Sequence, residues 1–147
     1  MREIEFRGKH DGKWFYGSLY WDYFNTRYEI KFHDDLCDYD TGIIPDHDTI
    51  GQYTGLKDKN GTKIFEGDIV QLTRTKMRAP TASFNGQDIV SKHLIYWDEE
   101  RHAFHQKHYT EERCIGGGSI DFEDVRAEEN IIEVIGNIHD NPELLKE

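Results

Sequence analysis

Apolar and polar residues alternate over residues 3–7 and 27–32 in the N-terminal part of the chain, and residues 14–20 between them are rich in aromatic residues. Alternation with a period of two places one set of side chains on a buried face, and aromatic residues favour strands, so these stretches predict three β-strands. Gly12 lies between the first two stretches and can take a positive φ, which favours a turn over residues 9–13. We therefore expect the first two strands to form a hairpin.

The middle of the chain consists of short apolar runs separated by glycine, asparagine and aspartate. Asn60-Gly61 suits a type I′ turn within residues 56–62, and a second reversal is expected at Glu66-Gly67-Asp68. The strands predicted here and beyond lie at residues 49–53, 64–65, 69–72, 90–97, 103–108 and 131–135.

Polar stretches separate these strands, and two segments near the C-terminus favour helical structure. Asn141 can cap a helix in which Pro142 and Glu143 occupy the first turn. The remaining expectations are a polar loop over residues 34–48, a long loop over residues 75–87, a glycine joint at residues 116–118 and a short helical turn over residues 122–129.

These elements predict a mainly β fold, with a hairpin-built, barrel-like single domain over residues 1–147 and one or two short helices. A chain of 147 residues is long enough to bury one hydrophobic core. The longest apolar runs, such as residues 94–97, fall far short of the roughly 20 residues of a membrane-spanning helix. The charged N-terminal residues do not resemble a signal peptide. We therefore expect no membrane partner.

Two cysteines, Cys37 and Cys114, lie far apart in sequence and form no CxxC motif. This usage favours two reduced thiols and a cytoplasmic location, although a disulfide between them stays an alternative. Trp, Tyr and Phe number 3, 8 and 8, and eleven of these 19 aromatic residues lie in residues 1–40. Rings in alternating strands favour a β core, and a stacking platform for a ligand is the alternative.

The net charge of -11 argues against generic nucleic-acid binding, because phosphates repel an acidic protein. The charge is uneven, however, and residues 57–78 are rich in lysine and arginine. Arg74, Lys76 and Arg78 would share one side of an extended strand, because their spacing is i, i+2, i+4. They are either charges that guard a strand edge or contacts to a nucleic-acid phosphate backbone.

Two groups of residues could hold a metal ion, although neither has the spacing of a known motif. His102, His105 and His108 would share a face of a helix, but a strand would point His105 away from the other two. The second group is polar loop sequence and comprises His33, Asp34, Asp35, Cys37, Asp38, Asp46, His47 and Asp48. We expect neither group to bind a metal, and we expect no cofactor.

The chain shows no motif of a catalytic nucleophile or a phosphate-binding loop. It has no GxSxG sequence, and the glycine triplet at residues 116–118 lacks both GxGxxG spacing and a following Lys-Ser/Thr pair. Glu66 and Asp68 flank a glycine, which favours hydrogen bonds to turn amides over acid–base catalysis. We therefore expect a protein that is not an enzyme.

Two central segments resemble the YopX family of phage and prophage proteins, and both ends of the chain add to the resemblance. The central segments are TIGQYTGLKDKNG at residues 49–61 and IFEGDIV at residues 64–70; the ends are IEFR at residues 4–7 and VIGNIHDNPELL at residues 134–145. The resemblance implies a mainly β fold and a bacterial host cell, but it implies no reaction. Residues 22–48 and 73–118 carry no pattern of this family.

Most residues of the central motif are typical of turns. A turn role is expected for Gly51, Gly55, Asp58, Asn60, Gly61, Glu66, Gly67 and Asp68. Gln52 and Tyr53 are not turn formers, so we expect them to contribute to a binding surface. The resulting hypothesis is a non-enzymatic phage accessory protein that binds a protein partner or a second copy of itself. A single-stranded nucleic-acid-binding module that uses residues 57–78 is the alternative, and a metal-dependent enzyme is a further one.

Overall fold

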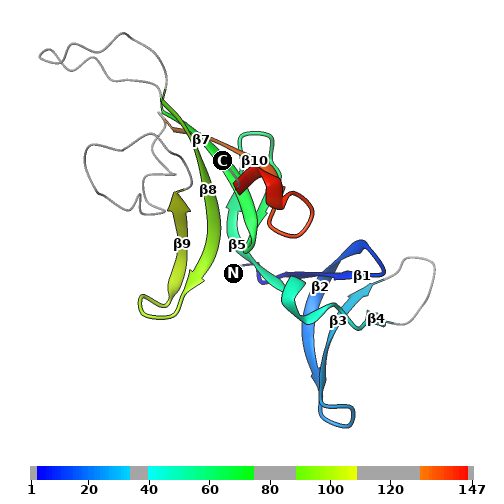
Figure 1. Ribbon diagram of the computed structural model, residues 1–147. Helices are drawn as coiled ribbons and strands as arrows, with labels where there is room; N and C mark the ends of the chain where they lie inside the picture. Colours follow the sequence, from blue (N-terminus) through cyan, green and yellow to red (C-terminus); the bar gives the residue numbers. More distant parts are fainter. Residues whose placement is uncertain (1–2, 34–39, 75–88, 109–129, 146–147) are drawn as a thin grey trace, which may run out of the picture. The chain divides into compact units, whose positions relative to one another are not determined.

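The computed structural model describes residues 3–33, 40–74, 89–108 and 130–145 (Figure 1). The chain divides into two compact units, each of which is described by itself. Unit 1 comprises residues 1–56 and 63–66, and unit 2 comprises residues 57–62 and 67–147.

The strands of unit 1 form an antiparallel sheet in the order β4-β3-β2-β1-β5-β6. Its first hairpin turns through Asp11 and Gly12, whose φ angles of 48° and 76° are both positive, as a type I′ turn requires. The bounds are Phe6–His10 for β1, Lys13–Asp22 for β2, Arg27–His33 for β3, Asp40–Ile43 for β4, Gly51–Lys57 for β5 and Lys63–Phe65 for β6. A short 3₁₀ helix, η1, spans His47–Thr49.

The long strand β2 changes partner at Gly17. It pairs with β1 up to Gly17 and with β3 from Ser18 onward. A Cβ atom on Gly17 would collide with the carbonyl oxygen of Lys31, so only glycine allows this close approach. Strand β4 reaches no farther along β3 than Ile30. Residues 20–22 of β2 and 27–29 of β3 therefore pair only with each other among the described strands. We call this end of the β2–β3 hairpin the two-stranded ribbon.

Unit 2 contains a four-stranded antiparallel sheet in the order β10-β7-β8-β9. A register shift between Val134 and Gly136 marks a bulge in β10 where it pairs with β7. The bounds are Asp68–Arg74 for β7, Ile89–Asp98 for β8, Ala103–His108 for β9 and Asn130–Asn137 for β10, followed by the 3₁₀ helix η3 at Pro142–Leu145.

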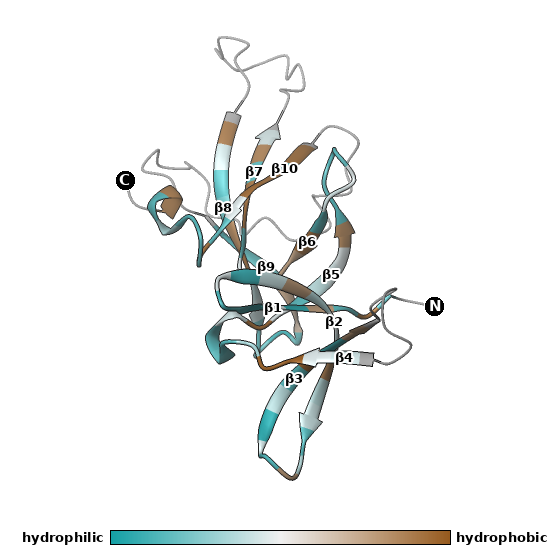
Figure 2. Ribbon diagram, turned by 90° about the vertical axis from the view of Figure 1, so that its right-hand side faces the viewer, coloured by the Kyte–Doolittle hydropathy of each residue, from teal (hydrophilic) through white to brown (hydrophobic). Residues whose placement is uncertain are grey.

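Each unit buries apolar side chains of its own strands, and Figure 2 shows brown, apolar segments along β6, β7 and β10. The most deeply buried apolar side chains of unit 1 are Ile30, Ile64, Phe65 and Tyr53. In unit 2 they are Ile69, Val70, Leu72, Ile95 and Ile132. The β-branched and aromatic residues at these positions favour strand structure as well as burial.

The turn between β5 and β6 is organised by the buried side chain of Asp58. Its Oδ1 atom accepts hydrogen bonds from the backbone N–H groups of Asn60 and Thr62, both at 2.8 Å. Its Oδ2 atom accepts a hydrogen bond from the N–H of Val134 in β10 at 3.1 Å. Burial alone would raise the pKa of Asp58, but the N–H groups of Val134, Thr62 and Asn60 together lower it below its usual value.

The same turn covers part of the outer edge of β10. The N–H of Lys59 donates to the carbonyl oxygen of Ile132 at 3.0 Å, beside the bond from Val134 to Asp58. The Lys59 ammonium and the Glu133 carboxylate form an ion pair at 2.6 Å. Backbone and side-chain contacts therefore satisfy groups that an open sheet edge would leave exposed.

The mainly β prediction is confirmed, and the described strands form two sheets, neither of which closes into a barrel. The type I′ prediction for Asn60-Gly61 is wrong. Gly61 has a φ of 83°, but Asn60 is not among the residues with positive φ. The N–H of Gly61 donates to the carbonyl oxygen of Asp58, which indicates a type I turn followed by a left-handed glycine.

The prediction of a loop over residues 34–48 is wrong in its second half, because β4 and η1 lie there. Pairing with the edge of β3 stabilises β4 despite its Asp and Gly residues. Several predictions lie outside the described residues: the loop at 75–87, the joint at 116–118, the helical turn at 122–129, Cys37 and Cys114. No helix in the described ranges is long and apolar enough to span a membrane.

Replacing Asp58 with alanine should destabilise the protein by about 2–4 kcal/mol, because three backbone N–H groups lose a charged acceptor. Asp98→Ala is the matched control, because the partners of the Asp98 carboxylate among the described residues lie in its own turn: the N–H groups of Glu100 and Arg101 and the Arg101 guanidinium. We expect a smaller loss for this control, because no bond to another strand is removed. Urea unfolding measures both values, and an equal or smaller loss for Asp58→Ala would contradict the role assigned to it.

Candidate binding surface

Four aromatic side chains gather on the two-stranded ribbon of unit 1, and we call Trp21, Tyr23, Phe24 and Tyr28 the ring cluster. Trp21 in β2 lies directly opposite Tyr28 in β3, with ring centroids 4.7 Å apart at 62°. The rings of Tyr23 and Trp21 are nearly perpendicular, and their centroids lie 6.5 Å apart. Tyr23 and Phe24 are 80% and 98% exposed, so the cluster is a surface feature.

The turn at the end of the ribbon places these rings in solvent. The Asp22 carboxylate accepts hydrogen bonds from the backbone N–H groups of Phe24 and Asn25. Thr26 then takes a φ of 50°, which closes the turn. A side-chain bond from Asn25, together with these backbone bonds, lowers the pKa of Asp22. Local hydrogen bonding therefore fixes Tyr23 and Phe24 at the tip of the ribbon.

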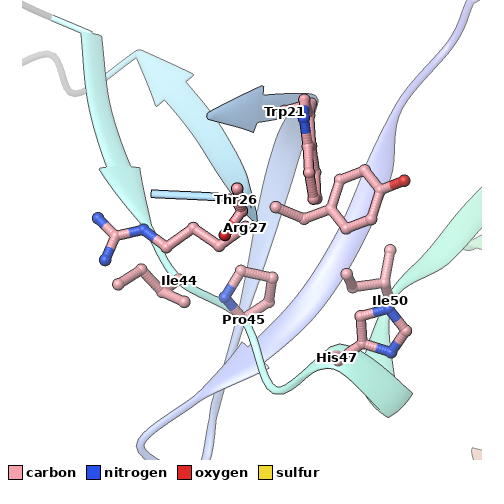
Figure 3. A pocket seen from close by; sticks show the side chains of 8 residues that line it. Trp21, Thr26, Arg27, Ile44, Pro45, His47 and Ile50 are labelled. Atoms are coloured by element: carbon pink, nitrogen blue, oxygen red, sulfur yellow. The ribbon is translucent and has the colours of Figure 1, made fainter. Parts of the chain in front are cut away.

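A pocket of about 440 Å³ lies beside the ring cluster, between the ribbon and the segment at residues 44–50 (Figure 3). The ribbon and this segment each supply half of its lining, and the segment contributes aliphatic and imidazole groups. The lining residues are Trp21, Thr26, Arg27, Tyr28, Ile44, Pro45, His47 and Ile50.

Hydrogen bonds to β1 hold the segment at residues 44–50 in place. The N–H of Asp46 donates to the carbonyl oxygen of Lys9 at 2.7 Å, and the Lys9 N–H donates to Thr49 Oγ1 at 2.8 Å. His10 Nδ1 lies 2.7 Å from the carbonyl oxygen of Ile44. This wall of the pocket is therefore fixed by the sheet of unit 1 itself.

The positive charge at the pocket is paired with carboxylates, whereas two negative charges next to the pocket are exposed to solvent. Arg27 lines it, but its guanidinium bonds to Glu29 at 2.9 Å and lies 3.9 Å from Asp22. Figure 3 shows that this guanidinium points away from Trp21 and His47. Asp46 and Asp48 flank His47 and are exposed, and the Asp48 side chain is fully exposed. The pocket therefore combines a largely apolar lining with exposed carboxylates on both sequence neighbours of its lining residue His47.

The sequence-predicted binding residues do not form one surface. Tyr53 is 4% exposed and packs against Phe65 at 5.5 Å, so it belongs to the core of unit 1. Gln52 is half-buried and pairs with Phe6 in the β1–β5 ladder. Arg74 ends β7 in unit 2, whereas Lys76 and Arg78 lie outside the described residues.

Most of the motif residues expected in turns lie at turns or strand ends, but Gly55 lies inside β5. Gly55, Gly61 and Gly67 have φ angles of 87°, 83° and 82°, which side chains rarely tolerate. A Cβ atom on Gly51 would lie 2.5 Å from the carbonyl oxygen of Glu66, and that oxygen also accepts a bond from Arg7. Asp68 begins β7 and is 1% exposed. Asn60 donates its N–H to Asp58.

In the described ranges, no group of three His, Cys, Asp or Glu residues is placed to hold a metal ion. The strand prediction for residues 103–108 is confirmed, so the helix that would have aligned the three histidines is not formed. His102 precedes that strand with a φ of 51°. Asp34, Asp35, Cys37 and Asp38 lie outside the described residues.

One pair with catalytic residue types occurs in unit 2, on β8. Ser91 Oγ and His93 Nε2 lie 2.7 Å apart. A nucleophile must reach its substrate, but these residues are 7% and 1% exposed. The hydrogen bond therefore satisfies two buried polar groups within the sheet.

Sequence reasoning missed the pocket, because its lining comes from two segments that only tertiary structure brings together. The available signal was the run of rings beside Asp22 and Asn25, both of which favour a turn. A tight turn between two strands lies at the protein surface, so two adjacent aromatic residues in such a turn are expected to be exposed.

The comparisons with known proteins give a family and solved structures that resemble the chain. The family model described as YopX protein matches residues 5–146. No curated protein matches the chain. The crystal structure of protein EF1440 from Enterococcus faecalis is 23% identical, with a TM-score of 0.45 over 99% of this chain and 100% of that chain.

Trp21 and Tyr28 should contribute little to folding if their main role is on the surface. They are 36% and 39% exposed, so Trp21→Ala and Tyr28→Ala should each cost less than the loss of a fully buried side chain. The control is Ile30→Ala on the same hairpin. Ile30 is 0% exposed, so its loss should cost about 2–5 kcal/mol in urea unfolding. A larger loss for Trp21→Ala than for Ile30→Ala would instead make the pair a structural element.

Proposed function

The chain belongs to the YopX family, and we propose that it is a non-enzymatic accessory protein of a phage or prophage that binds a protein partner in the cytoplasm of its bacterial host. The surface assigned to this binding is the ring cluster with the adjacent pocket.

The observation that carries the proposal is the exposure of the ring cluster. Phe24 and Tyr23 are 98% and 80% exposed at the tip of a hairpin, where folding derives no burial energy from them. Aromatic side chains are enriched at protein interfaces because each buries a large area with few rotatable bonds. Contiguous exposed rings mark interaction surfaces more often than isolated apolar residues do.

The chemistry of the pocket supports a contact role. Its lining combines rings with the aliphatic side chains of Ile44, Pro45 and Ile50, and such groups provide shape and apolar area. The charge favours protein over nucleic acid as the partner. The chain carries a net charge of -11, and Asp46 and Asp48 stand exposed beside the pocket. A phosphate backbone would be repelled there.

A variant with Tyr23→Ser and Phe24→Ser should lose the partner and keep its fold, because both side chains are at the exposed tip. The measurement is affinity capture from host lysate, with light scattering of the purified protein to detect a second copy as the partner. We expect at least about a tenfold loss of captured partner, which is the scale of one interface hot spot.

Tyr20→Ser is the matched control, because Tyr20 is 46% exposed on the other face of the same hairpin. It should retain the partner. The proposal fails if the tip variant and the control capture equal amounts, or if the wild-type protein is monomeric and captures nothing reproducibly.

A further inference from the structure

Lysine and arginine side chains cover several aromatic rings of unit 1. The Arg7 guanidinium lies between Trp14, at 4.7 Å from the ring centroid, and Phe65, at 5.1 Å. The Lys31 ammonium lies 3.9 Å from the centroid of Tyr20. Two further contacts place Lys9 over Trp14 and Lys63 over Tyr53. Cation–π attraction of this kind is favoured where a ring face is partly shielded from water.

The two aromatic rings that line the pocket, Trp21 and Tyr28, lack such a contact with a cation among the described residues. No lysine or arginine in the described ranges lies over Trp21 or Tyr28. Arg27 neighbours both rings in the β2–β3 ladder, yet it bonds to the Glu29 carboxylate. The ring faces of the pocket therefore have no cation from the described part of their own unit.

Acidic residues next to His47 add electrostatic attraction for a cation. Asp46 and Asp48 are exposed and flank His47, which lines the pocket. His47 Nδ1 lies 3.5 Å from Asp48 Oδ1, and both side chains are largely in solvent. A cation that enters the pocket would thus lie beside the rings of Trp21 and Tyr28, and the exposed carboxylates next to His47 would attract it.

We propose that this pocket binds an arginine side chain presented by a basic segment of the partner protein. The inference rests on the proposed function and adds the chemistry of the partner. Arginine fits better than lysine because its planar guanidinium stacks on aromatic faces and is more weakly hydrated than an ammonium group. The arrangement repeats, between two proteins, the contact that Arg7 makes with Trp14 and Phe65 inside unit 1.

The test is a titration of the ¹⁵N-labelled full chain with a short acetylated peptide amide of arginine, glycine and serine. The Trp21 indole N–H signal, assigned by its loss in Trp21→Leu, reports occupation of the pocket. Replacing each arginine by citrulline keeps the shape and removes the charge. We expect the arginine peptide to shift the Trp21 signal and to bind at least about tenfold more tightly than the citrulline peptide.

Two variants separate the ring and charge contributions. Trp21→Leu keeps an apolar side chain but removes the π face, so it should abolish binding. Binding to this variant is followed by the backbone amide signals of His47 and Ile50 in the pocket wall, and unchanged amide signals of Ile30 and Ile64 show that unit 1 is still folded. Asp46→Asn with Asp48→Asn should weaken binding several-fold and flatten its salt dependence. Tyr20→Ser is the control and should bind as the wild type does.

Equal affinity for the arginine and citrulline peptides would overturn the inference, as would unchanged binding by Trp21→Leu. Tighter binding of a single-stranded oligothymidine than of the arginine peptide would overturn it as well, and would favour base stacking instead. If the peptide fails but the tip variant still loses its captured partner, the inference fails while the proposed function stands. If neither the peptide nor any partner binds, both fail.

Discussion

A single carboxylate, that of Asp58, joins the turn between β5 and β6 to the edge of β10. It accepts bonds from two N–H groups of its own turn and from Val134, which is 76 residues away in sequence. Without an acceptor, these N–H groups would lose a charge-assisted bond in a largely buried environment. Because Lys59 also donates its N–H to Ile132, the turn shields an edge that would otherwise be open to pairing.

The residues that hold the fold and the residues assigned to binding lie in different parts of the sequence. The central YopX motif contributes turn glycines, Asp58 and the buried Tyr53 and Phe65. The exposed rings and the pocket come chiefly from residues 21–28 and 44–50, nearly all of which lie outside that central motif. Such a division would let one scaffold carry different contact surfaces, because changes at an exposed hairpin tip cost little stability.

Local patterns predicted most strands, because alternation reports directly which face is buried. They failed where a tertiary contact decides the structure. β4 forms despite its Asp and Gly residues because the edge of β3 is available to it, and Asn60 keeps a negative φ because Asp58 accepts its N–H. Tyr53 resembled a surface residue in sequence, but its position in β5 directs it onto Phe65. The pocket could not be predicted, because Trp21 and Pro45 meet only in the folded unit.

The most direct test of the role of Asp58 is amide hydrogen exchange at Val134 in the wild type and in Asp58→Asn. The substitution keeps size and places an amide where the acceptor oxygen faced the Val134 N–H. We expect protection at Val134 to fall at least about tenfold, since about 1.4 kcal/mol of local stability corresponds to that factor, while Ile30 keeps its protection. Unchanged protection at Val134 would contradict the account, because the turn would then be held to β10 without this carboxylate.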